Sequence, residues 1–407
     1  MYVARRGLPR AFEPRKLRLR RRNQRREPMM KLTRTNEHRA NRGNTVSPRH
    51  GETGCGKARA ATQGSDDGRS WRGDCFCIRG SLSAADFPQA NRNRWAKGDG
   101  VTDSQTGAPV TRHTLFQAAS TSKPVTALAA LKLVERGVLH LNGDVNRELK
   151  SWKMPANQFT REHPVDLRSL LSHTAGTTVH GFGGYSVRER LPTLRQILDG
   201  VKPANSPPIR VDKVPGKGFR YSGGGTLIAQ RLVMDVTKEP FPEVMRSLVL
   251  NPIGMASSTY EQPLPKHLRA SAASGHDDKG HPIPGKWHIY PEMQAAGLWP
   301  TPADMARYII EIQLANEGRS AKVLHREMIN KMLTSQDGGP AGLGPFLTGT
   351  GARRRFSHNG PNAGFRCNFV GLLNRGDGAV FMTNSDLGDP LIEEVFKSIA
   401  TVYGWPD

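Results

Sequence analysis

Residues 119–128 of this 407-residue chain read ASTSKPVTAL, and apolar residues continue beyond them at helical spacing as far as Val134. Gly137 is placed to end the element, and Pro124 is tolerated because it falls in the first turn. The sequence therefore predicts a helix over residues 121–136. Its other face is mostly alanine, which indicates a helix buried among close neighbours.

Two polar residues stand at the start of this predicted helix. Ser120 opens it and Lys123 follows three residues later, so both side chains project from one face about one turn apart. A lysine at the start of a buried helix loses solvation, which disfavours its charged form, and the helix dipole favours negative charge at the serine. The pair predicts a serine nucleophile with a lysine base. For the pair alone, the alternative is a serine cap beside an exposed lysine.

Two later segments carry side chains suited to the same chemistry. YSGGG at residues 221–225 places Tyr221 on a glycine-rich loop, where backbone can approach a substrate. FSHNG at residues 356–360 places His358 at the end of a predicted strand. Taken singly, Tyr221 could equally be a packed tyrosine without a catalytic role. Likewise, His358 alone could be a polar residue whose hydrogen bonds are satisfied within the fold.

The remaining periodic segments define the fold class. We expect helices over residues 226–236, 241–250, 302–315 and 391–403, and strands over residues 353–358, 365–373 and 379–384. Thr301 can cap the third of these helices, with Pro302 in its first turn and Asp304 completing a capping box. Helices followed by an antiparallel meander predict an α+β domain.

The N-terminal segment is strongly basic. The chain carries a formal charge of +23, and residues 1–80 hold 21 Lys and Arg against 7 Asp and Glu. With few apolar residues the segment cannot offset its ordering entropy, so we expect residues 1–75 to be a disordered extension and residues 76–407 to form the folded domain. Such a tail can contact nucleic acid or an anionic surface, or it is an extension upstream of the true start.

Three other classes of protein find little support. No apolar run is long enough for a signal peptide or membrane span, which indicates a cytoplasmic protein as written, or a periplasmic one if the start is misassigned. The four cysteines, Cys55, Cys75, Cys77 and Cys367, form no zinc or disulfide pattern, so we expect no metal and no cofactor. GETGCGKA at residues 51–58 resembles a phosphate-binding loop but ends in Ala58 and lacks a strand–loop–helix context.

Two flanking segments add to the three motifs. They are LLSHTAG at residues 170–176 and AGLWPTPAD at residues 296–304. From Phe76 onward the chain resembles the β-lactamase-related branch of the serine β-lactamase and penicillin-binding-protein superfamily, which contains AmpC-type enzymes, DD-peptidases and esterases. This resemblance implies an antiparallel sheet flanked by helices with an inserted all-helical region. It also implies a covalent acyl-enzyme formed on a D-Ala-type peptide, a β-lactam or a carboxylic ester.

The resemblance also assigns roles to individual residues. Ser120 would be the nucleophile, Lys123 its base partner and Tyr221 the proton shuttle to the leaving group. His358 would polarise the site or bind a substrate carboxylate, and His173 would be structural. The expected substrate-binding residues are Gly223, Asn359, Gly360 and Arg366.

Three departures from the family pattern bear on activity. Gly223 stands where an asparagine is usual. His358 stands where a lysine is usual, and its largely neutral imidazole binds a carboxylate more weakly unless Arg354 or Arg366 supplies charge. Pro361 stands where a backbone amide usually helps to form the oxyanion hole, and proline has no amide hydrogen. The sequence thus predicts slow turnover, unless Asn362 or another donor substitutes. The alternatives are a catalytically silent relative that binds peptidoglycan-like peptides and a nucleic-acid binder acting through its tail.

Overall fold

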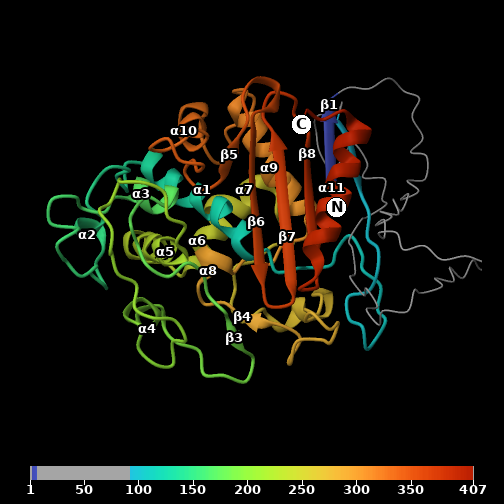
Figure 1. The fold of residues 1–407 in the computed structure, drawn as a ribbon, viewed down its shortest axis with the longest axis horizontal. Helices are drawn as coiled ribbons and strands as arrows, with labels where there is room; N and C mark the ends of the chain where they lie inside the picture. The colour runs from blue at the N-terminus through green and yellow to red at the C-terminus, as the bar shows by residue number, and fades with distance from the viewer. Residues whose placement is uncertain (1, 7–91, 407) are drawn as a thin grey trace, which may run out of the picture. The chain divides into compact units, whose positions relative to one another are not determined.

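The computed structural model describes residues 2–6 and 92–406, and its centre is a six-stranded antiparallel sheet (Figure 1). The strands are ordered β2-β1-β8-β7-β6-β5 across the sheet. A separate two-stranded sheet joins β3 to β4. The strand bounds are β1 Tyr2–Arg6, β2 Arg92–Ala96, β3 Tyr185–Ser186, β4 His288–Ile289, β5 Phe346–Thr348, β6 Arg355–Asn362, β7 Phe365–Leu372 and β8 Gly378–Thr383.

Helices fill the chain between β2 and β5 and close it after β8. The α-helices are α1 Ser122–Glu135, α2 Val145–Glu148, α3 Leu167–Ser172, α4 Leu194–Asp199, α5 Gly223–Thr237, α6 Phe241–Met245, α7 Asn251–Ile253, α8 Met293–Ala296, α9 Pro302–Asn316, α10 Arg326–Met332 and α11 Gly388–Tyr403. Tighter or wider turns are η2 Ala119–Thr121, η3 Arg246–Leu250, η4 Lys266–Ser271 and η5 Gly351–Arg353. No helix in residues 92–406 combines the length and apolar character needed to cross a membrane.

The sheet is covered by a helix on each face. Helix α11 packs through Ile392 and Ile399 on the face that carries Val370 and Phe381. Helix α9 covers the other face, where the Tyr308 ring meets Phe356 and Phe369 edge to face. Alternate residues of β7 therefore face different helices, as a strand period of two requires. The predicted α+β class, a sheet flanked by helices with a helical insertion, is confirmed.

Helix α1 lies where the sequence placed it. The turn η2 and helix α1 together span the predicted range, and Arg136 caps the end. Every residue from Ser122 to Leu131 is buried, as the alanine-rich second face indicates. Because α1 has no solvent face along this stretch, its first turn is held by neighbours on all sides.

Other predicted helices differ at their ends. Helix α5 begins at Gly223, three residues early, because the Ser222 hydroxyl accepts a hydrogen bond from the Gly225 amide and caps it. Thr301 caps α9 as predicted, but Asp304 completes no capping box. Its carboxylate instead accepts hydrogen bonds from Ser257 and Ser258. The helix expected over residues 241–250 is present as α6 followed by the π-helical turn η3.

Strand β6 is longer than predicted and is shifted along the chain. It begins at Arg355, after the turn η5, and continues through Pro361 to Asn362. Its pairing with β7 is uninterrupted, with Pro361 opposite Arg366. Strand β5 pairs only with residues 355–357, so from His358 onward β6 has one open edge. A proline fits there because its nitrogen need not donate to a neighbouring strand.

The N-terminal residues depart from expectation in one respect. Tyr2–Arg6, expected to belong to the basic extension, forms β1 between β2 and β8. Strand pairing uses backbone groups, which the charge pattern does not report. The described residues do not include the rest of the extension or the predicted boundary at residue 75. The phosphate-loop-like segment and three of the cysteines also lie outside them.

The sheet meets helix α1 at Gly360. A Cβ atom added there would collide with the backbone nitrogen of Ser120 and lie 2.9 Å from the Ala119 Cβ. Backbone atoms cannot swing aside as flexible side chains do. The absence of a side chain at Gly360 therefore allows the strand to approach the start of the helix.

We predict that Gly360→Ala moves β6 away from Ser120. Thermal unfolding should occur at a lower temperature, with a loss of about 2 kcal/mol or more, as expected for overpacking. Gly183→Ala is the matched control, because a Cβ at Gly183 meets nothing within 4 Å. Equal unfolding temperatures for the two variants would contradict the close approach.

Candidate active site

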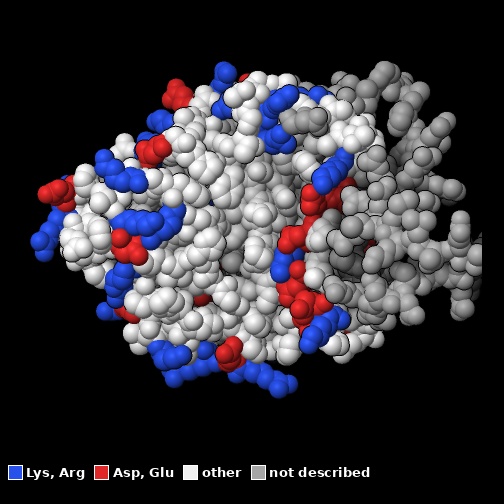
Figure 2. Space-filling model, viewed as in Figure 1, with Lys and Arg blue, Asp and Glu red and all other residues white. Residues whose placement is uncertain are grey.

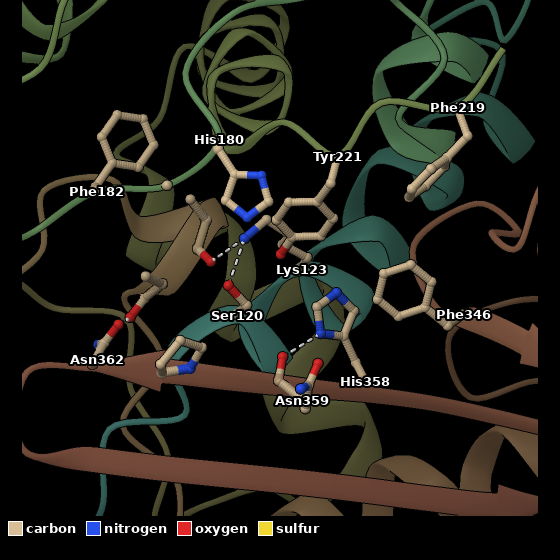
Figure 3. A pocket seen from close by; sticks show the side chains of 14 residues that line it. Ser120, Lys123, His180, Phe182, Phe219, Tyr221, Phe346, His358, Asn359 and Asn362 are labelled. Atoms are coloured by element: carbon tan, nitrogen blue, oxygen red, sulfur yellow. Dashed lines mark hydrogen bonds between the residues drawn. The ribbon is translucent and has the colours of Figure 1, made fainter. Parts of the chain in front are cut away.

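A cavity of about 530 Å³ lies beside the junction of α1 and β6. Ser120 comes from η2, Lys123 from the first turn of α1, Tyr221 from the residue before the Ser222 cap of α5, and His358 from β6. Figure 3 shows these side chains pointing toward one another. The full lining is Ser120, Lys123, His180, Gly181, Phe182, Phe219, Tyr221, Ala295, Ala296, Phe346, His358, Asn359, Pro361 and Asn362.

Ser120 and Lys123 are in direct contact. The Lys123 Nζ donates to the Ser120 Oγ and to the carbonyl oxygen of Ala295, both at 2.9 Å. Lys123 is 4% exposed, so its ammonium or amine is held by these two oxygens and not by solvent. The backbone before the serine is strained, because Ala119 has φ +49°, a region that non-glycine residues rarely occupy. Such strain persists only where surrounding packing enforces it.

Tyr221 is held in place by His173. The His173 carbonyl accepts from the Arg220 amide, and its Nδ1 accepts from the Ser222 amide at 3.2 Å. Its ring also lies 4.3 Å from the Tyr221 ring, centroid to centroid. Burial, helped by nearby Lys123, holds the pKa of His173 well below its usual range. The ring is therefore neutral and can accept a hydrogen bond at Nδ1.

His358 is a second buried, neutral imidazole. Burial, with a smaller effect from Lys123, lowers its pKa to about 3. Its Nδ1 lies 2.6 Å from the Asn359 carbonyl oxygen. Its ring lies 4.9 Å from that of Phe346 and 6.0 Å from that of Tyr221. Within residues 92–406, the Nε2 atom has no hydrogen-bond partner.

Aromatic side chains that the sequence analysis did not single out form much of the wall. His180, Phe182, Phe219 and Phe346 all line the cavity, and the His180 ring lies 4.9 Å from the Tyr221 ring. Figure 3 shows Tyr221 between His180 and His358. HGFGGY at residues 180–185 is the one relevant sequence signal, because glycine beside aromatic residues is typical of a loop that approaches a ligand.

The expected substrate-binding residues fall into two groups. Asn359 lines the cavity, and Gly360 lies beneath the Ser120 nitrogen. Gly223 lies behind the wall, where an added Cβ would be 3.0 Å from the Phe182 ring. Arg366 is not brought into the cavity, because its guanidinium pairs with Asp386 at 2.8 Å and Asp389 at 3.3 Å.

Two other residues named from the sequence make hydrogen bonds within the protein. Arg354, named from the sequence as a possible source of charge, precedes β6 and donates to the Leu333 carbonyl oxygen. The Asn362 Nδ2 donates to Gln117 at 2.8 Å and to the Ala296 carbonyl oxygen at 3.2 Å. Arg354 is therefore absent from the cavity lining, whereas the Asn362 side chain lines the cavity with its amide nitrogen bound to these two acceptors.

Charge is sparse around this site. Lys123 is the only Lys or Arg among the described residues that line the cavity. In the view of Figure 2, charged side chains lie mainly over the helical region and along α11, and the middle of the face is largely uncharged. Within the described part of the chain, no three His, Cys, Asp or Glu side chains gather as metal ligands would.

One cavity thus holds a helix-opening serine, a lysine one turn later, a tyrosine and a strand histidine. The model of the Beta-lactamase family matches residues 82–401. The chain belongs to this family of serine hydrolases.

The individual relatives share 30% sequence identity or less with this chain over the aligned residues. Esterase EstB of Burkholderia gladioli is 30% identical over 204 residues, which are 46% of this chain and 48% of EstB, so the chain spans about half the length of that relative. The penicillin binding protein from Bacillus halodurans superposes with a TM-score of 0.60 at 20% identity, over 81% of this chain and 94% of that chain. The D-amino acid amidase from Ochrobactrum anthropi SV3 gives 0.59 at 19% identity, over 81% and 93%. At these identities the two structures show a shared β-lactamase/transpeptidase-like fold.

A buried carboxyl group lies next to the cavity wall. Glu292 directly precedes α8, whose Ala295 and Ala296 line the cavity, and it is fully buried. Burial raises its pKa to about 8, against smaller lowering effects of its own backbone amide and the Tyr185 hydroxyl. Glu292 therefore stays protonated in the folded protein at neutral pH.

We predict that Glu292→Gln stabilises the protein at alkaline pH. In the unfolded chain the carboxyl ionises near pH 4.5, whereas the folded protein keeps its proton until about pH 8. Folding stability thus falls as pH rises between these values and is flat above them. Glutamine removes this cost, so the variant should gain a few kcal/mol at pH 9 and about none at pH 4. Thermal or urea unfolding at both pH values measures the gain, and a gain independent of pH would contradict the assignment.

Proposed function

We propose that this chain hydrolyses carboxylic esters or amides through an acyl-enzyme on Ser120. The observation that carries the proposal is the 2.9 Å contact between the Lys123 Nζ and the Ser120 Oγ, inside a cavity that Tyr221 also lines. The names of its relatives, an esterase and an amidase, support this substrate class. A D-Ala-type peptide, a β-lactam and a carboxylic ester all contain the required carbonyl group.

In the proposed reaction, Lys123 acts as the base and takes the hydroxyl proton as the Ser120 Oγ bonds to the substrate carbonyl carbon. The carbonyl oxygen becomes an oxyanion, which the backbone amide of Ser120 stabilises. As the intermediate collapses, the bond to the leaving group breaks and Tyr221 protonates the departing atom. The Lys123 Nζ lies 5.0 Å from the Tyr221 ring centroid, so the two side chains are neighbours, and Lys123 is the group proposed to return that proton. Water then attacks the ester by the reverse sequence and frees Ser120.

Stabilisation of the oxyanion is the weak point of this mechanism. Pro361 lines the cavity on the open edge of β6, and the strand keeps regular pairing through it. Because proline has no amide hydrogen, Pro361 cannot supply a backbone donor to the oxyanion. The loss of one such donor costs on the order of a hundredfold to a thousandfold in rate. We infer slow turnover.

The same proline favours a second candidate function. A relative without an effective oxyanion hole could bind a peptidoglycan-like peptide and never turn it over. The two functions differ in one observable, which is covalent modification of Ser120 by a reactive substrate analogue.

A fluorophosphonate probe, followed by intact mass and peptide mapping, tests the proposed hydrolase. We expect one adduct on wild type, located at Ser120, and no adduct on Ser120→Ala. Ser247→Ala is the control, because this exposed serine lies on η3, away from the cavity lining. A wild-type protein that takes no label, while binding peptide, would instead establish the silent relative.

We predict that Pro361→Ala raises kcat on a reactive phenyl ester by about tenfold or more, because the new amide supplies an oxyanion donor. KM should change little, since the donor acts mainly on the transition state. Rates are normalised to the fraction of enzyme that the fluorophosphonate titrates. An unchanged kcat would mean that the oxyanion is stabilised elsewhere.

A further inference from the structure

The position of the proton on His358 determines what the ring can offer a substrate. Its Nδ1 lies 2.6 Å from the Asn359 carbonyl oxygen, and a carbonyl oxygen only accepts hydrogen bonds. Nδ1 therefore carries the hydrogen. In a neutral imidazole the other nitrogen then has a lone pair and no hydrogen. The Nε2 atom of His358 is thus a hydrogen-bond acceptor.

This acceptor is unused and buried. His358 is 2% exposed, and in residues 92–406 its Nε2 finds no partner. A buried polar atom without a hydrogen bond is unfavourable, so a ligand that supplies a donor recovers that cost. Figure 3 shows this nitrogen directed away from Asn359 and toward the side of the cavity that holds Tyr221.

Among the described residues that line the cavity, Lys123 is the only lysine or arginine, and it is already engaged. Lys123 donates to Ser120 and Ala295. Arg366 is paired with Asp386 and Asp389, and Arg354 donates to a carbonyl oxygen away from the site. Apart from His358, the titratable groups of the lining are Lys123, Tyr221 and His180, and His180 lies on the opposite side of Tyr221 from His358.

The rest of the wall is apolar or uncharged. Phe182, Phe219 and Phe346 supply aromatic surface. Along β6 the uncharged residues Asn359 and Pro361 complete the wall. Such a wall takes an ionised group out of water without compensating it, which is strongly unfavourable. A carboxylate beside the lone pair of the His358 Nε2 would meet repulsion as well.

We propose that this site selects substrates whose leaving group carries a neutral hydrogen-bond donor, a hydroxyl or amide N–H, and no carboxylate, with the His358 Nε2 as the acceptor. The proposal rests on the acyl-serine hydrolase function above, because Tyr221, beside His358, is the group assigned to the leaving atom. Penicillin-type β-lactams and peptides ending in D-Ala carry a carboxylate on the departing side. The site therefore disfavours both.

Two esters of nearly equal shape test this selection. 3-Carbamoylphenyl butyrate offers an amide N–H, whereas 3-carboxyphenyl butyrate offers a carboxylate at the same position. Phenyl butyrate serves as the unsubstituted reference, and each kcat/KM is divided by the rate of hydroxide-catalysed hydrolysis. For wild type we expect the carbamoyl ester to exceed the carboxyl ester by about tenfold or more.

Variants at position 358 locate the selection. His358→Lys should move the ratio toward the carboxyl ester by about tenfold or more, because an ammonium replaces the acceptor. His140→Lys is the matched control: it makes the same substitution at an exposed histidine outside the cavity lining, and should leave the ratio unchanged. If His358→Lys does not fold, His358→Phe retains an aromatic ring against Phe346. It should abolish the advantage of the carbamoyl ester over phenyl butyrate.

The outcomes separate this inference from the function on which it rests. Ser120-dependent hydrolysis in which the carboxyl ester equals or exceeds the carbamoyl ester would overturn the inference and leave the hydrolase intact. A ratio that is unchanged in both position-358 variants would overturn the inference in the same way. Failure to cleave any of the three esters in a Ser120-dependent way would overturn the proposed hydrolase itself.

Discussion

The close approach of β6 to the start of α1 is the constraint on which the site depends. Gly360 leaves room for the strand beside the Ser120 nitrogen, and buried neighbours hold Ala119 in a left-handed conformation just before the serine. The strand then carries His358 and Pro361 along one side of the cavity. A methyl group added at Gly360 would displace the strand and so move all these groups relative to Ser120, because closely packed backbone atoms cannot adjust separately.

The arrangement of elements could be predicted well from the sequence, because helical period, strand period and capping residues are local signals. Helix α1, helix α9 and the meander of β6, β7 and β8 follow from them. The errors have local causes too. Helix α5 starts early because Ser222 caps it, and β6 continues through Pro361 because its outer edge is unpaired. Strand β1 depends on long-range backbone pairing, for which Tyr2–Arg6 carries no local signal.

The candidate site was predictable only in part. Ser120, Lys123, Tyr221 and His358 belong to recognisable motifs, and the structure brings them to one cavity. The aromatic wall comes from segments far apart in the chain, such as Phe182 and Phe346, so no spacing rule could group them. Arg366 looked suitable by charge alone. Its partners Asp386 and Asp389 lie about twenty residues away and are brought to it only by the fold.

The proposed chemistry requires Lys123 to activate Ser120 for acyl transfer. The most direct measurement is the rate at which an aryl N-butylcarbamate carbamoylates wild type and Lys123→Met, with the modified residue identified by tandem mass spectrometry. We expect a carbamoyl group on Ser120 and a rate lower by about a hundredfold to ten-thousandfold in the variant. A carbamoyl group on another residue, or equal rates for two equally stable proteins, would contradict it.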